Sequence, residues 1–467
     1  MSTMWERGGA GVAWRPRDMQ TENDEAQGVE GDVDGAEDVR RMRPLAPGRR
    51  IDARVRIPGS KSLTNRALVL AAMAKGRSRL VGALRSDDTV ACTQGLRDLG
   101  IAVRVESDGE VLVVEGSGGG PTAAEACVDA RLSGTTARFL APYLALGRGR
   151  YRLDAAARMR ERPMGALWQA LRDQGVRIDG GPALPWTVYG AGGLAGGALR
   201  IGGDDTTQPA SGLLMAGPFA RRDLELTVDS RRAALPHVAM TAGLMARFGV
   251  ACESPGEGRF RVPAGAVYRP GTYEIEPDAS AAAYFWALAA LSGGRVHTPG
   301  IGRSRLQGDA AFLEVLEEMG CRVEAASDGG AVVQGPDGGR LRAVRRDMSA
   351  MGDQVLTLGV LGLFADGPCE VHNVSHIRLQ ESDRVAAAVT ELRRLGACCE
   401  ERPDGFAVWP LSPEAVAPVR VRTYGDHRLA MSFALAGLRR PGVVIADPGC
   451  VSKTFPSFFQ VLDGAVG

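Results

Sequence analysis

One pattern recurs five times along the chain, at intervals of 71 to 76 residues. In each copy, apolar residues at helical spacing lead to a glycine, and two short alternating segments then follow on either side of a polar turn. The five glycines are Gly100, Gly175, Gly249, Gly320 and Gly396. Apolar residues at i, i+3, i+4 and i+7 predict one buried helix face, and glycine accepts the left-handed conformation that ends a helix. Each copy therefore predicts a helix followed by a β-hairpin.

A sixth predicted helix, SFFQVLDG around Gly464, closes the chain with no hairpin after it. The missing strands can come from RRIDARVRIPG, near the start, if the two chain ends lie in one domain. A chain of 467 residues is also too long for one ordinary core. We therefore expect an α/β protein of six units, three in each of two lobes with a cleft between them. Residues 46–59 and 277–467 would form one lobe, and residues 60–276 the inserted lobe.

The bulk properties exclude several classes of protein. A formal net charge of +1 argues against a nucleic-acid binder, which needs excess cations on one face. The sequence has no uninterrupted apolar stretch of about 18 to 20 residues, so we expect no membrane span. The eight cysteines show no metal-ligand spacing and are typical of a reduced cytoplasmic protein. Residues 1–45 contain eight acids and no base between Glu22 and Asp38, which predicts a disordered tail.

Three predicted helix starts carry groups that suit an anion. Lysine occurs only three times in the chain, and one copy, Lys61, lies in PGSKSLTNRALVLAA, where a glycine-containing turn opens an apolar helix. The N-terminus of a helix favours negative charge. Arg66 follows five residues later, close enough for Lys61 and Arg66 to bind the two ends of one small acid. Similar starts occur in SGTTAR at Gly134 and in DDTTQ at residues 206–208.

The second half of the chain supplies further charged groups. Arg162 stands before a proline, and Lys453 precedes the last predicted helix. In IRLQESDRVAAAV, Glu381 and Arg384 are three residues apart, which predicts that they share one helix face. GDHRLAM places His427 and Arg428 at another helix start. Asp353 stands immediately before an apolar helix, either as an ordinary cap or as a base beside a ligand.

Ten segments together identify a resemblance: PGSKSLTNRAL, SGTTAR, MRERP, TTQ, PDASAAAYF, LQGD, the Asp353 segment, QESDR, GDHRLAM and SKTFPSF. In this order, from about residue 46 to residue 467, they resemble 5-enolpyruvylshikimate-3-phosphate synthase. The resemblance implies the two-lobed enolpyruvyl transferase fold, an inverse α/β barrel. It implies transfer of the enolpyruvyl group of phosphoenolpyruvate to the 5-hydroxyl of shikimate 3-phosphate, with release of phosphate, in the shikimate pathway to the aromatic amino acids. It implies no metal and no cofactor, and nothing in the sequence demands more than a monomer.

The resemblance also implies a role for each matched residue. Around phosphoenolpyruvate it places Lys61, Gly134, Arg162, Gln208, Arg384, Arg428 and Lys453. Around the acceptor it places Lys61, Ser62, Arg66, Thr206, Thr207, Gln208, Asp353 and Gln380. Ser62 and Arg66 would bind the carboxylate, Thr206 and Thr207 the 3-phosphate, and Gln208 the ring. Asp353 would be the base on the hydroxyl, with Lys61 and Glu381 as candidates for proton delivery and His427 as a lesser one.

The departures from the family pattern gather at the acceptor end. Gln380 replaces a lysine, Ala234 a serine, His237 a tyrosine, and Leu132 and His376 asparagines. One explanation is drift with local compensation by a histidine or arginine; another is a paralogue acting on an unphosphorylated shikimate-like acid. The sister enzyme acting on UDP-N-acetylglucosamine shares the fold and donor, but SKSLTNRA and GDHRLAM resemble the shikimate branch. A non-catalytic binding protein would predict loss of Asp353, Glu381 or Lys61, and all three are present.

Overall fold

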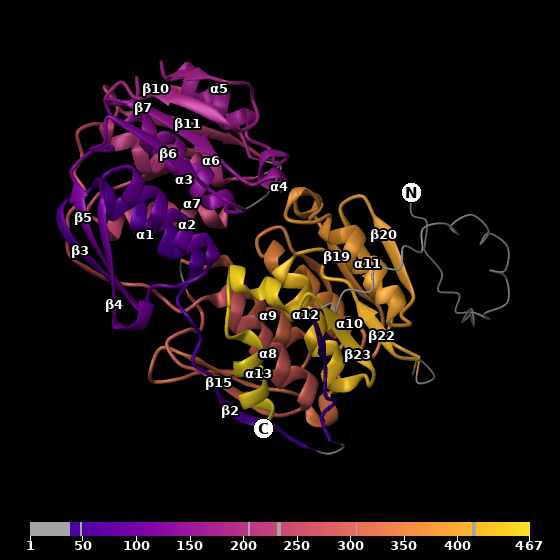
Figure 1. Ribbon diagram of the computed structural model, residues 1–467. Coiled ribbons are helices and arrows are strands. Elements are labelled where there is room, and N and C mark those ends of the chain that lie inside the picture. Colours follow the sequence, from indigo (N-terminus) through magenta and orange to yellow (C-terminus); the bar gives the residue numbers. More distant parts are fainter. Residues whose placement is uncertain (1–37, 47–48, 204–205, 231–234, 305, 413–416) are drawn as a thin grey trace, which may run out of the picture. The chain divides into compact units, whose positions relative to one another are not determined.

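The computed structural model describes residues 38–46, 49–203, 206–230, 235–304, 306–412 and 417–467 (Figure 1). Residues 38–467 form one compact unit. Within it the buried apolar side chains fall into two separate cores. One core contains residues 63–275, and the other combines residues 42–57 with residues 279–462. We keep the boundaries proposed from the sequence as names: residues 60–276 are called the inserted lobe and the remainder of the unit the terminal lobe.

The inserted lobe alternates helices with short strands. Its helices are α1 (Lys61–Met73), α2 (Asp87–Asp98), α3 (Gly134–Ala145), α4 (Ala157–Arg160), α5 (Gly165–Asp173), α6 (Gln208–Ala216) and α7 (Pro236–Arg247). Its strands are β3 (Lys75–Val81), β4 (Ala102–Glu106), β5 (Val111–Ser117), β6 (Glu125–Asp129), β7 (Arg150–Asp154), β8 (Arg177–Asp179), β9 (Trp186–Tyr189), β10 (Gly197–Gly202), β11 (Leu224–Asp229), β12 (Glu253–Gly256), β13 (Arg259–Val262) and β14 (Thr272–Glu274).

The terminal lobe has the same alternation. Its helices are α8 (Ala279–Ser292), α9 (Phe312–Glu318), α10 (Val355–Gly362), α11 (Arg384–Arg394), α12 (His427–Arg439) and α13 (Phe458–Val466). Its strands are β1 (Val39–Arg41), β2 (Asp52–Arg54), β15 (Arg295–Thr298), β16 (Arg322–Ala325), β17 (Ala331–Gln334), β18 (Arg345–Asp347), β19 (Cys369–His372), β20 (Cys399–Arg402), β21 (Gly405–Val408), β22 (Val419–Val421) and β23 (Val443–Ala446).

Five of the sheets have one design, in which an edge strand runs parallel to its neighbour and an antiparallel hairpin completes the sheet. Their strand orders are β14-β3-β5-β4, β6-β7-β9-β8, β10-β11-β13-β12, β2-β15-β17-β16 and β18-β19-β21-β20. The five hairpins are those predicted from the repeat, and each repeat glycine has a φ between 80° and 103°. The prediction of helix, left-handed glycine and hairpin is therefore confirmed at all five positions.

The sixth sheet corrects two expectations. Its order is β1-β23-β22, so its added strand is β1, whereas the segment RRIDARVRIPG supplies β2 to the β15 sheet. β1 lies inside the segment predicted to be a disordered tail, and that expectation is wrong for residues 39–41, because they pair with β23. Residues 1–37 lie outside the described part of the chain. Helix α13 does not end before Gly464, as the helices of the other five units end before their glycines, and instead continues to Val466.

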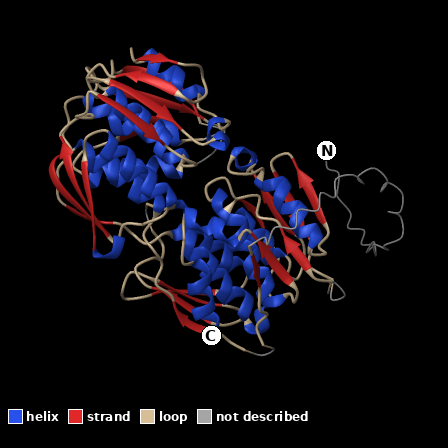
Figure 2. Ribbon diagram, viewed as in Figure 1, coloured by secondary structure: helices blue, strands red, loops and turns tan. Residues whose placement is uncertain are grey.

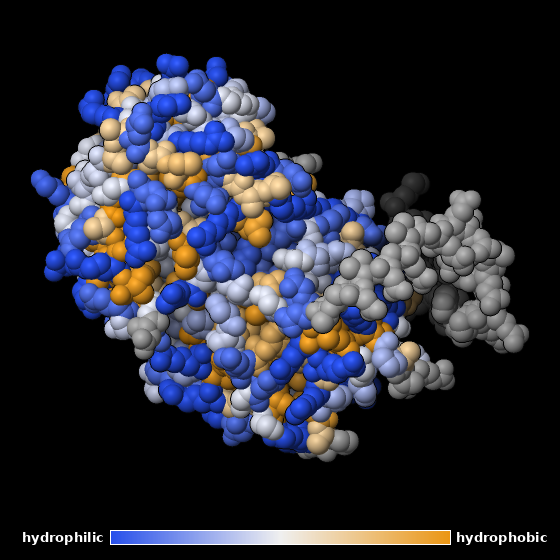
Figure 3. All heavy atoms as spheres, in the orientation of Figure 1, coloured by the Kyte–Doolittle hydropathy of each residue, from blue (hydrophilic) through white to orange (hydrophobic). Residues whose placement is uncertain are grey.

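Helices occupy the interior of each lobe and sheets lie outside them, as Figure 2 shows. The sequence explains this arrangement, because α8 and α10 are apolar on all sides and can be stable in water only when surrounded. The strands alternate buried and exposed residues, so one face covers the helices and the other meets solvent. Hydrophilic residues accordingly predominate on the face shown in Figure 3. Among the described residues, no helix is long and apolar enough to cross a membrane.

The chain passes between the lobes twice, at one place. Gly59 and Pro277 form an antiparallel bridge, Ser60 N–H donates to the Glu276 carbonyl at 2.9 Å, and Asp278 N–H donates to the Pro58 carbonyl at 2.8 Å. A Cβ atom at Gly59 would lie 1.8 Å from the Gly82 carbonyl oxygen, so only glycine fits there. The two crossings lead directly into the starts of α1, which lines the site described next, and of α8, which lines a smaller pocket beside it.

Candidate active site

One pocket is lined by side chains of both lobes. It brings together every residue assigned to the site from the sequence: Lys61, Ser62, Arg66, Gly134, Arg162, Thr206, Thr207, Gln208, Asp353, Gln380, Glu381, Arg384, His427, Arg428 and Lys453. Asp88, Thr135 and Ile377 also line it and were not predicted. The helix starts that carry the predicted residues therefore converge on one pocket although they are far apart in the sequence.

Lys61 is the first residue of α1 and is held by two carboxylates. Its backbone N–H donates to Asp278 Oδ2 at 3.1 Å, and its Nζ lies 3.2 Å from Asp88 Oδ2. Asp88 is buried in the first turn of α2. Acids at a helix start are usually caps, so the segment SDDTV alone did not identify Asp88 as a site residue. The ammonium is thereby fixed at the pocket wall by a residue of the same lobe.

Three arginines of the inserted lobe have no acidic partner in the described residues; Arg66 and Arg138 are buried, and Arg162 is half-buried. Arg66 donates to Thr241 Oγ1 at 2.7 Å and to the Ser62 carbonyl at 3.0 Å. Arg138 donates to Gln208 Oε1 at 2.9 Å. Arg162 has only a 3.6 Å contact with the Met159 sulfur, and its Nε has no hydrogen-bond partner. Burial lowers the pKa of Arg66 and of Arg138 to about 9, and it lowers the pKa of Arg162 as well. Uncompensated buried cations of this kind favour an anionic ligand.

The cations of the terminal lobe are, in contrast, paired with buried carboxylates. Asp353 Oδ1 lies 2.9 Å from Arg384 Nη1, and Asp353 Oδ2 lies 2.6 Å from Arg428 Nη2. Asp426, fully buried, accepts from Arg384 Nε at 2.8 Å and also caps α12 by accepting from the Arg428 backbone N–H. Burial alone would raise the pKa of Asp353, but Arg428 and Arg384 outweigh it and hold that pKa well below its usual value. Asp353 lies in a short 3-10 turn, η5 (Gly352–Gln354), and its side chain does not cap α10.

Glu381 joins two other predicted residues. Its Oε2 lies 2.8 Å from His427 Nδ1, and its Oε1 lies 3.0 Å from Lys453 Nζ. Burial disfavours its charge, yet His427 and Lys453 together hold the pKa of Glu381 well below the ordinary value. Burial also lowers the pKa of His427. The predicted sharing of one helix face by Glu381 and Arg384 is wrong, because α11 begins at Arg384 and Glu381 lies in the turn before it.

The described residues contain one group of side chains at metal-ligand spacing, Glu381, Asp426 and His427, whose ligand atoms lie within 4.8 Å of one another. Each of the two carboxylates is already neutralised by a cation, Glu381 by Lys453 and Asp426 by Arg384. A divalent ion would have to displace both ion pairs in a pocket that is already rich in cations. The donor set therefore fits the ion pairs that it makes better than it fits a metal.

The acceptor end is polar and has few fixed charges. Thr206 and Thr207 precede α6, and the Gln208 backbone N–H donates to Thr206 Oγ1 at 3.3 Å. Gln380, His237 and His376 line the same part of the pocket. Among the departures from the family pattern, Ala234 lies outside the described residues.

Hydrogen bonds from Ser452, Lys453 and Arg158 join the lobes at the pocket. Ser452 Oγ donates to Asp87 Oδ2 at 2.7 Å, and Lys453 Nζ donates to the Leu132 carbonyl at 3.4 Å. Arg158 donates to the Glu381 carbonyl at 3.4 Å. Ser452 and Lys453 end the 3-10 turn η7 (Pro448–Lys453), and Asp87 begins α2. The loops that close the pocket are thus the same ones that carry Lys453, Glu381 and Asp88.

The charge of the lining indicates the kind of ligand that the pocket suits. Six lysine and arginine side chains line it, against three carboxylates, and three of these cations come from each lobe. Charge-assisted hydrogen bonds from guanidinium groups are strong and directional, and they match carboxylate and phosphate oxygens. A small ligand with several negative charges would therefore neutralise the excess and hold the two lobes together.

Comparison with known proteins assigns the family. A family model described as EPSP synthase (3-phosphoshikimate 1-carboxyvinyltransferase) matches residues 45–462. A curated protein of Trichormus variabilis named 3-phosphoshikimate 1-carboxyvinyltransferase is 43% identical over 417 residues, covering 89% of this chain and 96% of that protein. A protein of the same name from Cupriavidus necator is 42% identical, covering 91% of this chain and 99% of that protein. A chloroplastic protein of that name from Arabidopsis thaliana is 41% identical, covering 90% of this chain and 83% of that protein.

A solved structure shares the fold. The EPSP synthase of Acinetobacter baumannii matches with a TM-score of 0.75 at 24% identity, over 90% of this chain and 97% of that one. An enolpyruvyl transferase from Streptomyces tendae matches with a TM-score of 0.72 at 20% identity, over 90% of this chain and 96% of that one. At such low identity these likenesses concern the fold alone, and they confirm the predicted two-lobed architecture.

Proposed function

The chain belongs to the EPSP synthase family, and we propose here how its own residues carry out the reaction of that family. It is a transferase that moves the enolpyruvyl group of phosphoenolpyruvate to the 5-hydroxyl of shikimate 3-phosphate and releases phosphate. The single observation that carries the site assignment is the interlobe pocket, because all of the matched residues line it. The curated relatives reported above are named for the phosphorylated acceptor, and none of them favours an unphosphorylated one.

The donor is proposed to bind between the arginines of the two lobes. Arg162 has no acidic partner in the described residues and is ready for an anion, whereas Arg384 and Arg428 must exchange one partner, Asp353, for the ligand. Lys453, at the end of the turn η7, contributes a further positive charge to the donor site. Gly134 is the first residue of α3 and lies next to the Arg162 side chain. Because glycine has no side chain, it leaves room for the ligand beside the helix N-terminus.

The acceptor is proposed to bind on the other side of Lys61. Arg66, buried with no acidic partner in the described part of the chain, would bind the carboxylate together with Ser62. The hydroxyls of Thr206 and Thr207 would bind the 3-phosphate, with Gln380 donating from the terminal lobe. Gln208, held by Arg138, would contact the ring. Since Gln380 carries no charge where the family pattern has a lysine, this end depends more on neutral donors.

Asp353 is proposed to become a base only when the donor is bound. Two arginines, Arg428 and Arg384, hold the pKa of Asp353 well below its usual value, where it cannot take a proton from a hydroxyl group. Donor oxygens that engage Arg384 and Arg428 would weaken both ion pairs, and burial would then raise the pKa of the carboxylate. Activation of the base is thereby coupled to occupancy of the donor site.

The reaction requires three proton transfers: one from the hydroxyl oxygen, one to the methylene carbon and one from the resulting methyl group. The 5-hydroxyl oxygen attacks C2 of phosphoenolpyruvate while Asp353 takes its proton, and Lys61 gives a proton to the methylene carbon, which forms the tetrahedral intermediate. The bond from C2 to the phosphate oxygen then breaks as that oxygen takes a proton, the equivalent of the one that Asp353 removed, and hydrogen phosphate leaves. The methyl group returns a proton to the enzyme as the double bond re-forms. Glu381, ionised between His427 and Lys453, is placed to accept that proton. Positioned acids and bases contribute about 10²- to 10⁴-fold each.

We further propose that the enzyme works as a cytoplasmic monomer that closes over its substrates. Closure excludes water, which would otherwise weaken the electrostatic contacts and hydrolyse the intermediate.

The experiment is to measure phosphate release from phosphoenolpyruvate on addition of shikimate 3-phosphate, with the product identified by its mass, for the natural chain and for Asp353→Ala. We expect the natural chain to release phosphate and the variant to lose turnover by about 10²- to 10⁴-fold. The variant should still bind phosphoenolpyruvate in a calorimeter, and more tightly, because Arg384 and Arg428 lose a competing partner. Unchanged turnover in Asp353→Ala would contradict the assignment. The control is Asp337→Asn, which removes only an exposed ion pair with Arg50.

A further inference from the structure

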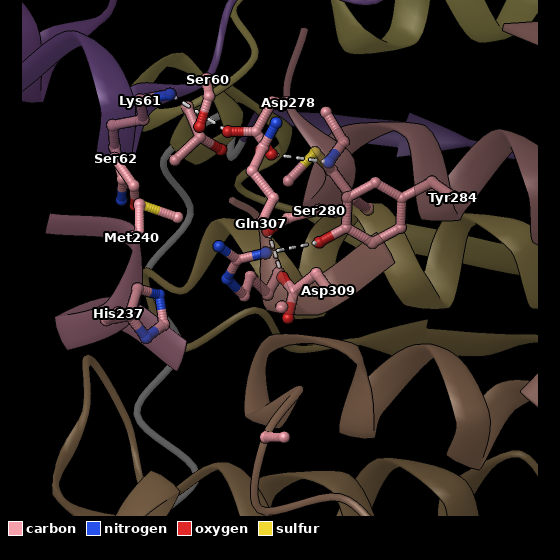
Figure 4. Close-up of a pocket in the computed structure, with 16 residues that line it drawn as sticks. Ser60, Lys61, Ser62, His237, Met240, Asp278, Ser280, Tyr284, Gln307 and Asp309 are labelled. Atoms are coloured by element: carbon pink, nitrogen blue, oxygen red, sulfur yellow. Dashed lines mark hydrogen bonds between the residues drawn. The ribbon is translucent and has the colours of Figure 1, made fainter. Parts of the chain in front are cut away.

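A second, smaller pocket adjoins the active site, and Arg428 forms part of the wall between them. Arg428 lines both pockets; Asp353 lines the larger one and Asp309 lines the smaller one. Figure 4 shows Ser280, Tyr284 and Asp309 directed into the same small space, beside Gln307. The guanidinium group reaches Asp353 Oδ2 at 2.6 Å on the side of the active site and Tyr284 OH at 3.4 Å on the other side.

Asp309 is a buried carboxyl group, 8% exposed, in the 3-10 turn η3 (Gly308–Ala311). It accepts a hydrogen bond from Ser280 Oγ and a longer one, of 3.4 Å, from Gln354 Nε2. Among the described residues no lysine, arginine or histidine lies within ion-pair distance of it. Asp309 therefore differs from Asp353 and Asp426, each of which directly contacts an arginine.

The titratable groups around the small pocket come from every element packed against Asp309. Asp278 and Tyr284 belong to the start of α8, Asp353 to η5 and Arg428 to α12; Lys61 and His237 face it from α1 and α7. Burial raises the pKa of Asp309 to about 7, and the negative charge of Asp353 adds to this effect, whereas Arg428 and Ser280 oppose it. Asp309 thus changes charge near neutral pH, while Asp353 stays ionised in the empty site.

The charge on Asp309 matters because of its place behind Arg428. When Asp309 is neutral, Arg428 has one carboxylate partner, Asp353, and an incoming anion need displace only that one. When Asp309 is ionised, a second negative charge lies on the far side of the same guanidinium group and opposes the binding of a donor anion. Like charges in a buried setting repel one another strongly, because the low dielectric screens them weakly.

We propose that Asp309 is a positioning residue for Arg428, and that its protonation state sets how strongly Arg428 binds the anionic donor. This rests on the proposed function of the large pocket, in which Arg428 contacts phosphoenolpyruvate. Nothing covalent happens at Asp309; it releases its proton to solvent as the pH rises and takes one back as the pH falls. Donor affinity should accordingly fall as the pH rises through the pKa of Asp309.

The test compares the natural chain with Asp309→Asn, which has similar shape and no charge at any pH. The Michaelis constant for phosphoenolpyruvate is measured with saturating shikimate 3-phosphate, from about pH 6 to about pH 8.5. The phosphate group of the donor titrates in the same range, but it does so equally for both proteins and cancels in their ratio. We expect this ratio, natural chain over variant, to rise on the order of tenfold across the range. A ratio that stays constant with pH would overturn the proposal and leave Asp309 a structural residue.

A second variant tests the same idea without removing the carboxyl group. Ser280→Ala deletes a hydrogen-bond donor that favours the ionised form of Asp309, so the pKa of Asp309 should rise. The pH at which the ratio of Michaelis constants is halfway through its rise should then move upward. An unmoved midpoint would count against the proposal. Calorimetric binding of phosphoenolpyruvate provides a readout that does not need turnover. If no protein releases phosphate but the calorimetric affinities still show the predicted pH dependence, the proposed function fails and the role of Asp309 stands.

Discussion

At the scale of single residues, each cation that the terminal lobe brings to the pocket is held by a carboxylate. Arg384 and Arg428 share Asp353, and Lys453 contacts Glu381. In the inserted lobe, Lys61 contacts Asp88, but Arg66 and Arg162 have no acid in the described residues. A donor anion therefore meets an arginine without an acidic partner, Arg162, on one side and must replace a carboxylate on the other. The carboxylate that it displaces is Asp353, the proposed base.

Lys61 provides a direct test of a proton-transfer role. Lys61→Arg keeps the positive charge but replaces a compact ammonium group by a guanidinium group that does not give up a proton at neutral pH. We expect kcat to fall by about 10²- to 10⁴-fold while the melting temperature stays near that of the natural chain. Lys75→Arg is a matched control, because Lys75 is exposed in β3 and lines neither pocket. A kcat for Lys61→Arg close to that of Lys75→Arg would show that Lys61 supplies only charge.

The sequence could indicate the cations of the site but not most of the acids that hold them. Lysine is rare in this chain, and the arginines stand in recognisable segments, so each could be assigned from its local setting. Asp88, Asp309 and Asp426 instead stand at the starts of helices or turns, where an acid is usually an ordinary cap. Only the packing of distant segments places Asp426 against Arg384 and Asp309 behind Arg428.

At the scale of elements, the site is made of helix starts. α1, α3 and α6 of the inserted lobe, and α11 and α12 of the terminal lobe, each direct their first residues to the pocket. The free backbone N–H groups and the positive end of the dipole at each start favour anions. The repeat places these starts at similar positions in successive units, which is why residues about 70 residues apart meet.

Gly134 shows how closely one helix start is fitted. A Cβ atom there would lie 2.6 Å from Arg138 Nη1 and 2.9 Å from Arg162 Nη1, so an added methyl group must displace Arg162. We expect Gly134→Ala to raise the Michaelis constant for phosphoenolpyruvate by about tenfold or more, a loss on the order of 1.4 kcal/mol. The rise for the acceptor should be smaller, since only Arg138, which holds Gln208, is disturbed on that side. Steady-state kinetics with each substrate varied in turn measures both constants. Gly119→Ala is the control, because nothing lies within 4 Å of its Cβ position. An equal change in both Michaelis constants would contradict this account.

The bond between Ser452 and Asp87 ties η7 to α2 across the pocket. Ser452→Ala and Asp87→Ala should each lower kcat/KM for phosphoenolpyruvate by about two- to tenfold, since a typical hydrogen bond contributes roughly 0.5 to 1.5 kcal/mol. Because both variants break the same bond, the double variant should lose little more than either single one. Additive losses in the double-mutant cycle would mean that the two side chains act independently of each other.

The elements were largely predictable because the repeat combines three signals: helical periodicity, a glycine at the helix end and a polar turn. The sixth unit was harder, since its sheet is completed by a three-residue strand, β1, from a segment of acidic composition. Composition averages over many residues and does not register a short strand of which only three residues pair. The turn carrying Glu381 was also assigned to the helix, because Asp383 caps α11 later than the periodicity suggested.

At the scale of the whole molecule, the two lobes divide the chemistry between them. The inserted lobe supplies Lys61 and the arginines that lack acidic partners among the described residues, and the terminal lobe supplies Asp353 and Glu381. Neither lobe alone has both a binding surface for the substrates and the proposed bases. The number of hairpins was enough to predict two lobes, but it could not predict that the acids and the free cations would separate between them.

The central claim is that this pocket transfers the enolpyruvyl group to shikimate 3-phosphate, despite Gln380 in place of a lysine at the acceptor end. The most direct measurement is phosphate release from phosphoenolpyruvate in parallel assays with shikimate 3-phosphate and with shikimate. Losing the phosphate removes several charge-assisted hydrogen bonds, so we predict that shikimate reacts at least about 10²-fold less efficiently, as judged by kcat/KM. Equal or faster turnover of the unphosphorylated acid would contradict the account.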